Sequence, residues 1–324
     1  MQPKKVLFTR VAALAVVCVA VVAFIFLQRI RLPTAIRAGA GRADHSALPK
    51  LQMAFFSVGQ GDAMLLRDAA GNDVLIDGGP TDAILTKLGR TMPLWDRTIE
   101  LIVLTHPHAD HVNGLVSVLE RYHADAIAMT GVRADTSAYA AFSRLIDEKK
   151  IPVHIITTST ILSVGLMRLE ILWPLESWHT RAPPTDTLST GGGLNDTSIV
   201  LALGYGDVRA LFMEDASAAV EARLLSASST LAADLLKVGH HGSMYSSSRA
   251  FLDAVRPAYA VIPVGARNRY GHPTLQTLLR LRDVQAKIFR TDRDGDVRVV
   301  TDGRAIGVMG ACGEEPCAAA SDGL

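Results

Sequence analysis

The densest set of potential metal ligands in the sequence lies between His106 and His111. In an extended segment, residues two apart point the same way, so His106 and His108 can hold one cation. Asp110 and His111 lie beyond the turn, where a helix is expected to begin, and can reach a second cation nearby. Imidazole and carboxylate ligands suit Zn²⁺, and suit Mn²⁺ or iron less tightly. The segment therefore predicts a site for two divalent metal ions, with Zn²⁺ as the first choice and Mn²⁺ as the alternative.

Further candidate ligands follow other predicted strands: Asp77, Asp215, His240, His241 and His272. Functional groups at the carboxyl ends of strands converge on one edge of an α/β sheet, so we expect these side chains to join the cluster. A carboxylate between two cations can bridge them, and we assign that role to Asp215, although taken singly it is equally a helix N-cap. Because His240 and His241 are adjacent, their side chains diverge. We assign His240 to a metal and His241 to the substrate, with the reverse assignment left open.

This chemistry predicts hydrolysis of a phosphodiester by a metal-activated water. The candidate catalytic residues are Asp215, His241 and His272, the two histidines stabilising developing charge or protonating the leaving oxygen. Taken alone, His272 is more typical of a packed or turn-capping histidine. The candidate substrate-binding residues are Lys237, Ser243, Asn268, Arg269 and Tyr270. A tyrosine can stack a base, as in proteins that bind single strands, but in a tight turn packing is its commoner role, and isolated basic residues are often solvated surface.

Strands and helices are both predicted in the central part of the chain. The predicted strands are residues 54–58, 63–67, 73–76, 101–104, 168–173, 198–203, 209–213, 234–238 and 258–264. The predicted helices are residues 114–121, 138–149, 216–225 and 274–282. Early strands follow one another closely and later ones alternate with helices, which indicates an α/β fold with a mixed sheet and helices on its faces.

Composition excludes several classes of protein. The chain has 324 residues, of which 49% are hydrophobic, so it can bury a large core and is not disordered. Its formal net charge of +1 excludes a globally basic nucleic-acid binder, so any polyanion must be held locally, by a patch or by bound metal. Its 3 Cys exclude a disulfide framework and a Cys-rich zinc site.

The first thirty residues differ from the rest. Residues 11–27 form an uninterrupted apolar run after Lys4, Lys5 and Arg10, close to the minimum needed to cross a bilayer. We expect residues 1–30 to be an uncleaved membrane anchor, with a cleaved signal peptide as the alternative. Residues 31–49 read as a linker, 50–307 as the hydrolase domain and 308–324 as a flexible tail. Cys312 and Cys317 can pair in an oxidising compartment, which favours an extracytoplasmic catalytic domain.

The motifs together resemble a known family. His106-x-His108-x-Asp110-His111 is similar to the signature of the metallo-β-lactamase fold, an αββα sandwich with metals at one edge. Accompanying motifs resemble the hydrolase domain of ComEC-type competence proteins: residues 57–63, 75–79, 195–198, 237–243 and 269–273. The resemblance covers about residues 50–303 and implies a nuclease that degrades one DNA strand during uptake. It also implies a metal set of His106, His108, Asp110, His111, Asp215 and His240 or His241, with Asp77 organising these ligands from behind.

The sequence departs from that family at particular points. Glu214 stands where the family usually has Gly, in Met213-Glu214-Asp215, and adds bulk and charge beside the site. Asn195 stands where lactamases have a third histidine, and it is a weaker ligand. One anchor replaces the multi-helix channel of competence proteins, so we do not expect this chain itself to conduct DNA.

These observations favour a membrane-anchored, metal-dependent nuclease or phosphodiesterase that acts on DNA, with its protein partners unknown. One alternative is a hydrolase of the same fold acting on a phosphocholine ester, thioester or lactam. Another is a non-catalytic DNA-binding subunit that has kept the fold.

Overall fold

The computed structural model describes residues 48–156, 160–174, 193–227 and 230–311. The predicted anchor (1–30), nearly all of the predicted linker (31–49) and most of the predicted tail (308–324) lie outside these residues. Within the described ranges, no helix combines the length and the apolar character needed to cross a membrane.

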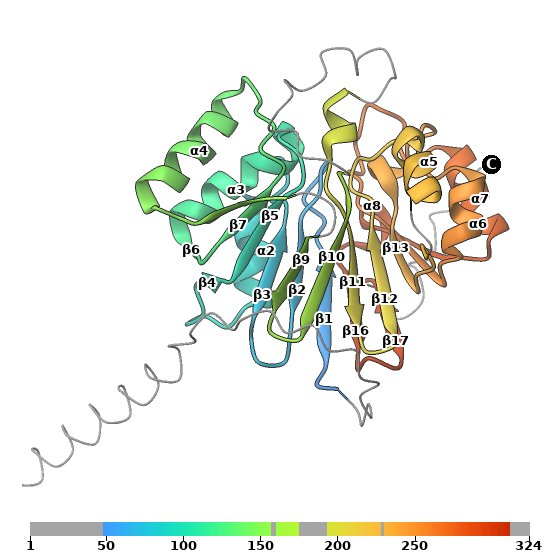
Figure 1. The fold of residues 1–324 in the computed structure, drawn as a ribbon, viewed down its shortest axis with the longest axis horizontal. Helices are drawn as coiled ribbons and strands as arrows, with labels where there is room; N and C mark the ends of the chain where they lie inside the picture. Colours follow the sequence, from blue (N-terminus) through green and yellow to red (C-terminus); the bar gives the residue numbers. More distant parts are fainter. Residues whose placement is uncertain (1–47, 157–159, 175–192, 228–229, 312–324) are drawn as a thin grey trace, which may run out of the picture. The chain divides into compact units, whose positions relative to one another are not determined.

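Two β-sheets pack face to face and form the centre of the fold (Figure 1). Across the first sheet the strands are β17 (Ile306–Met309), β16 (Val297–Thr301), β1 (Leu51–Phe55), β2 (Met64–Arg67), β3 (Asp73–Ile76), β5 (Leu101–Leu104), β7 (Ile127–Met129) and β8 (Val153–Ile155). Across the second they are β15 (Lys287–Arg290), β14 (Tyr259–Ile262), β13 (Leu235–Lys237), β12 (Val208–Phe212), β11 (Val200–Tyr205), β10 (Met167–Trp173) and β9 (Ile161–Val164). A short parallel pair, β4 (Thr98–Ile99) and β6 (His123–Ala124), forms a separate two-stranded sheet.

Helices cover the outer face of each sheet. The first sheet packs against α2 (Ala83–Thr91), α3 (Ala109–Arg121) and α4 (Ser137–Lys149) through one apolar cluster. The second sheet packs against α5 (Ala218–Ala227), α6 (Arg249–Val255) and α7 (Leu275–Asp283) through another. A short helix, α8 (Thr291–Asp294), joins β15 to β16, and 3₁₀ turns at Gly193–Thr197 and Gly239–Gly242 precede β11 and α6. The layers therefore run helix, sheet, sheet, helix.

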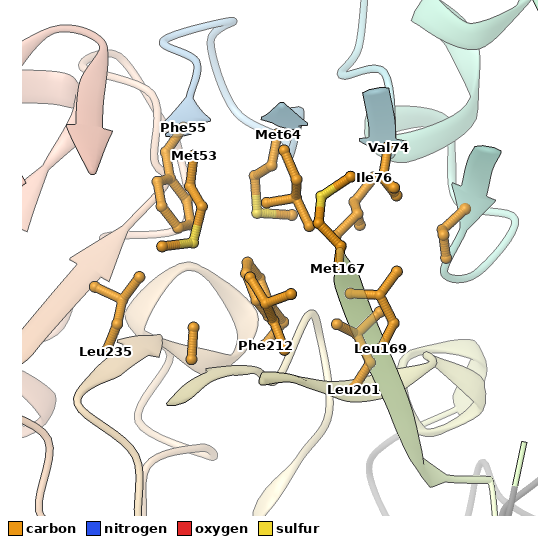
Figure 2. Packing of buried hydrophobic residues seen from close by; sticks show 14 of the residues in the cluster. Met53, Phe55, Met64, Val74, Ile76, Met167, Leu169, Leu201, Phe212 and Leu235 are labelled. Atoms are coloured by element: carbon orange, nitrogen blue, oxygen red, sulfur yellow. The ribbon is translucent and has the colours of Figure 1, made fainter. Parts of the chain in front are cut away.

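The main core lies between the two sheets (Figure 2). Met53 and Phe55 of β1 face the second sheet, whereas Ala54 between them packs toward the helices. The rings of Phe55 and Phe212 stack across the interface with centroids 6.1 Å apart. Strands buried on both faces lack polar alternation, which explains why they read as continuous apolar runs in the sequence.

The predicted α/β fold is confirmed. All nine predicted strands and all four predicted helices have counterparts in the structure, and residues 73–76 and 101–104 keep their limits. The largest change affects the helix predicted at residues 114–121, because α3 begins at Ala109 and so contains Asp110 and His111 in its first turn.

The first turns of α3 lie against the loop after β3, backbone to backbone. The Gly78 N–H donates to the His111 carbonyl (2.8 Å), and the Gly114 N–H donates to the Gly79 carbonyl (2.9 Å). A Cβ on Gly114 would lie 1.9 Å from the Gly78 carbonyl oxygen. Only glycine therefore allows this close approach, which brings His111 up to Asp77.

Gly114→Ala should lower the free energy of unfolding by about 1–3 kcal/mol, because the added methyl group overpacks this contact. The matched control is Gly89→Ala in α2, where a Cβ has no neighbour within 4 Å. It should raise stability by about 0.5–1 kcal/mol, since alanine favours a helix interior over glycine. Urea denaturation measures both, and equal effects of the two substitutions would contradict the close-approach argument.

Candidate metal centre

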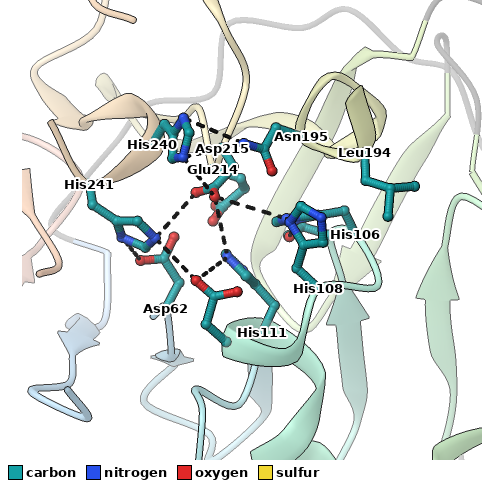
Figure 3. A network of polar contacts seen from close by, with 12 residues as sticks. Asp62, His106, His108, His111, Leu194, Asn195, Glu214, Asp215, His240 and His241 are labelled. Carbon is teal, nitrogen blue, oxygen red and sulfur yellow. Dashed lines mark hydrogen bonds and ion pairs between the residues drawn. The ribbon is translucent and has the colours of Figure 1, made fainter. Parts of the chain in front are cut away.

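The predicted ligands meet at one edge of the sandwich, where strands of both sheets end (Figure 3). In the first sheet, Asp77 follows β3, and His106 and His108 follow β5. In the second, Asp215 follows β12, and His240 and His241 lie in the turn after β13. The site opens into a pocket of about 390 Å³, lined by Gln60, His108, Ala109, Asp110, Asn195, Asp215, His240, His241, Tyr270 and His272.

One set of four residues, which we call the Asp110 group, could hold a metal ion: Asp110, His111, Asp215 and His241. Each offers a ligand atom, and these atoms all lie within 4.8 Å of one another. His111 Nε2 lies 3.6 Å from Asp215 Oδ2, and His241 Nε2 lies 3.6 Å from Asp215 Oδ1. Asp110 Oδ2 is also 3.6 Å from His241 Nε2. The four side chains thus converge on one small volume.

Hydrogen bonds behind this group orient its histidines. His111 Nδ1 donates to Asp77 Oδ2 (2.6 Å), and that carboxylate is held by the Thr105 N–H (2.9 Å) and hydroxyl (2.6 Å). His241 Nδ1 donates to the Pro263 carbonyl (2.9 Å). Each bond assigns the proton to Nδ1 and leaves the Nε2 lone pair facing the group, as in most histidines that bind metals.

Three buried atoms of the Asp110 group have no hydrogen-bond partner among the described residues: His111 Nε2, His241 Nε2 and Asp215 Oδ1. Leaving such atoms unsatisfied costs about 1–3 kcal/mol each. A divalent cation among them would accept their lone pairs, and imidazole and carboxylate are ligands that zinc and manganese bind. The residues present therefore fit a metal ion.

A second set, the His106 group, surrounds the same carboxylate with His106, His108 and His240. His106 Nε2 lies 3.9 Å and His240 Nε2 3.8 Å from Asp215 Oδ2. His108 Nδ1 is 3.0 Å from His106 Nε2. The structure thus places Asp215 between two groups of candidate ligands, as a bridging ligand requires, while the bridging itself stays a prediction.

The two groups differ in their electrostatics. In the His106 group, burial lowers the pKa of all three histidines and so favours the neutral form, which is the form that binds a cation. In the Asp110 group, burial opposes the charged form of His241, but Asp215 and Asp62 outweigh it and raise the pKa of this histidine to about 10. Asp77 and Asp215 likewise outweigh burial and raise the pKa of His111 well above its usual value. The carboxylates thus favour positive charge at the position that a cation would take.

The structure bears on the predicted roles of four residues. His241 is buried against Asp110 and Asp215 and joins the candidate metal ligands, the assignment that the sequence left open, while it also lines the pocket. Lys237 and Ser243 are buried and do not line the pocket, so neither can hold a phosphate there. Asn268 uses its amide inside its own loop, where Nδ2 donates to the Gly265 and His272 carbonyls and Oδ1 accepts from two backbone N–H groups.

The other predicted residues lie at or near the pocket. Asn195, Tyr270 and His272 line it, and Arg269 is exposed in the same loop as Tyr270. Asn195 Nδ2 lies 3.2 Å from His240 Nε2.

Sequence reasoning missed a buried ion-pair network beneath the metal centre. Lys237 is 0% exposed and pairs with the carboxylates of Asp62 and Glu214, the latter at 3.4 Å. Its Nζ also donates to the Glu214 carbonyl (3.0 Å). Asp62 Oδ1 in turn lies 3.3 Å from His241 Nδ1, so the network connects with a candidate ligand. A lysine inside an apolar strand, three residues before a pair of histidines, is the signal that could have indicated it.

Comparison with known proteins identifies one matching family and several relatives. The model of the metallo-beta-lactamase superfamily matches residues 57–266. The chain is 24% identical over 202 residues to ComE operon protein 3 of Bacillus subtilis (62% of this chain, 24% of the relative). It is 27% identical over 259 residues to recombination protein 2 of Haemophilus influenzae (78% and 29%), and 39% identical over 102 residues to competence protein ComA of Neisseria gonorrhoeae (31% and 15%). All three are ComEC-type competence proteins, and the chain spans less than a third of each.

Lys237→Met should lower the free energy of unfolding by about 3–5 kcal/mol, because it leaves two buried carboxylates without their cation. Lys149→Met, at an exposed position on α4, is the control and should change stability by less than about 0.5 kcal/mol. Chemical denaturation measures both. A loss below about 1 kcal/mol for Lys237→Met would show that Lys237 does not compensate buried negative charge in this network.

Adding Zn²⁺ or Mn²⁺ to chelator-treated protein should raise its unfolding temperature. A ligand that binds only the folded state stabilises it by about 4 kcal/mol at a thousandfold excess over its dissociation constant. Asp215→Asn and His241→Ala should each remove most of this gain, since both take a donor from the Asp110 group. His123→Ala, whose side chain is 71% exposed on β6, is the control and should keep the full gain. A full metal-induced shift in Asp215→Asn would rule out the assignment.

Proposed function

The chain belongs to the metallo-beta-lactamase superfamily, whose members are generally metal-dependent hydrolases, and we propose that it hydrolyses phosphodiester bonds of DNA. The observation that carries this proposal is the shared carboxylate: Asp215 lies between two groups of candidate ligands at the base of an open pocket. Sites that hold two cations close together are typical of phosphatases and nucleases.

In this proposal the Asp110 group holds one divalent ion and the His106 group holds the other, with Asp215 common to both. Zn²⁺ is the first choice and Mn²⁺ the alternative. Two such ions supply Lewis-acid charge to the phosphoryl oxygens and acidify a water molecule. The protein's own part is to orient the imidazoles so that Nε2 faces the group, through Asp77 behind His111 and the Pro263 carbonyl behind His241.

His272 supplies a further polar group at the pocket. Its ring lies 5.6 Å from that of His240. Burial, and then the neighbouring His240 and His241, lower its pKa to about 4. A neutral imidazole at pH 7 is suited to donate an N–H to charge that develops on a phosphoryl or leaving oxygen, rather than to act as a strong acid.

DNA as the substrate is supported by the relatives. Their names refer to competence and recombination, processes that act on DNA. The proposal includes attachment to a membrane through residues 1–30, with the catalytic domain outside the cytoplasm. These residues lie outside the described ranges, so the attachment rests on the apolar run in the sequence.

The two other hypotheses from the sequence predict a different substrate or the absence of turnover. A hydrolase of a phosphocholine ester, thioester or lactam would use the same metal centre on another substrate. A non-catalytic DNA-binding subunit would bind DNA without turnover, whether or not the ligands were intact.

The test is cleavage of single- and double-stranded DNA by the full chain with Mn²⁺ or Zn²⁺. We expect metal-dependent cleavage that Asp215→Asn reduces by at least about a thousandfold, because a shared ligand supports both cations. His123→Ala serves as the control and should cleave like the unaltered chain. Absence of cleavage by protein that carries two metal ions would refute DNA as the substrate. Cleavage that survives Asp215→Asn would refute the site.

A further inference from the structure

The loop between β14 and α7, residues 263–274, forms one wall of the pocket and is held in a defined shape. All the hydrogen-bonding capacity of the Asn268 amide is used inside it. The Gly265 N–H also donates to Gln60 Oε1 (3.1 Å), which ties the loop to the segment between β1 and β2. These bonds fix the positions of the side chains that the loop presents.

Tyr270 is the most prominent of these side chains. It lines the pocket although 63% of its surface is exposed. Its ring lies nearly parallel to that of His272, at 19° and 5.9 Å between centroids. The His272 ring in turn lies 5.6 Å from His240, a candidate ligand. A series of rings thus leads from solvent to the metal centre.

What sets Tyr270 apart from other exposed aromatic side chains is its place in the pocket wall, where the face of its ring is open to a ligand. Arg267 and Arg269 precede Tyr270 in the same loop; both are exposed, and neither has a carboxylate partner in the described part of the chain. An aromatic ring and exposed guanidinium groups presented by one loop are a combination with which proteins hold single-stranded nucleic acid: bases stack on the ring while phosphates meet the cations.

We propose that Tyr270 is a stacking platform for an unpaired base next to the scissile phosphate, so that the site prefers single-stranded to duplex DNA. In a duplex the faces of each base are covered by its neighbours, whereas an unpaired base offers a free face to the ring. This inference rests on the proposed function and adds to it a contact that selects for strandedness.

The experiment compares Tyr270→Ala and Tyr270→Phe with the unaltered full chain. Tyr245→Ala is the matched control, because Tyr245 is also an exposed tyrosine (71%) but does not line the pocket. Each protein is given a single-stranded oligonucleotide, the same strand with abasic sites around the cleavage position, and the duplex. KM and kcat are measured with Mn²⁺, and binding of the labelled strand is measured by anisotropy in EDTA.

We expect Tyr270→Ala to raise KM for the single strand, and to weaken its binding, by about tenfold. Cleavage of the abasic strand and of the duplex should not change. Tyr270→Phe should retain the unaltered behaviour because the ring remains, and Tyr245→Ala should do so as well.

Two results would overturn the inference: equal binding of the single strand by Tyr270→Ala and the unaltered chain, or an equal loss on the abasic strand. Failure of the proposed function looks different. In that case the unaltered, metal-loaded chain would cleave none of the three substrates.

Discussion

Asp215 is a carboxylate only 2% exposed, and the arrangement of the site follows from its buried charge. Burying an ionised group costs several kcal/mol unless positive charge or hydrogen bonds compensate it. His111 and His241 approach Asp215 to 3.6 Å, and Asp215 raises the pKa of both histidines, together with Asp77 for His111 and Asp62 for His241. The same field that retains protons on these rings would retain divalent cations in their place. β12 and β5, one strand from each sheet, end at the same edge, which brings Asp215 close to the histidines that follow β5.

The backbone at that edge is strained. Asp77, Glu214, His240 and His241 have φ values of 56°, 47°, 46° and 52°, in the left-handed region that residues other than glycine seldom adopt. Each such residue costs on the order of 1–2 kcal/mol. The parallel pairing of β12, β13 and β14 on one side and of β3 and β5 on the other anchors the chain before each turn. Regular strands thus supply the rigidity with which the turns aim the ligands.

Much of this fold can be predicted from the sequence, and the same physical reasons explain which elements and residue positions were not predicted. β3 and β5 were predicted to the residue because both faces are buried and the runs are apolar throughout. The edge strand β9 was missed because its residues are mostly half-buried or exposed, and α2 because only Ile84 and Leu88 are buried in it. The sequence predicted that the side chains of His240 and His241 diverge, because adjacent residues diverge in an extended chain. Here both have left-handed backbones in one turn, and both reach Asp215. Charge alone suggested a surface position for Lys237, but β13 lies inside the second sheet.

The two residues that depart from the family pattern, Glu214 and Asn195, lie at different depths in the site. Glu214 is 0% exposed and points below the metal centre toward Lys237, so its bulk does not narrow the pocket. It gives Lys237 a second carboxylate besides Asp62, and burial raises the pKa of the Glu214 carboxyl well above its usual value. Asn195, by contrast, lines the pocket beside His240. The His106 group therefore offers neutral imidazoles and the shared Asp215, while the Asp110 group adds Asp110, a carboxylate of its own, to Asp215. Because carboxylates add charge attraction to ligation, we expect the Asp110 group to attract a cation more strongly than the His106 group does.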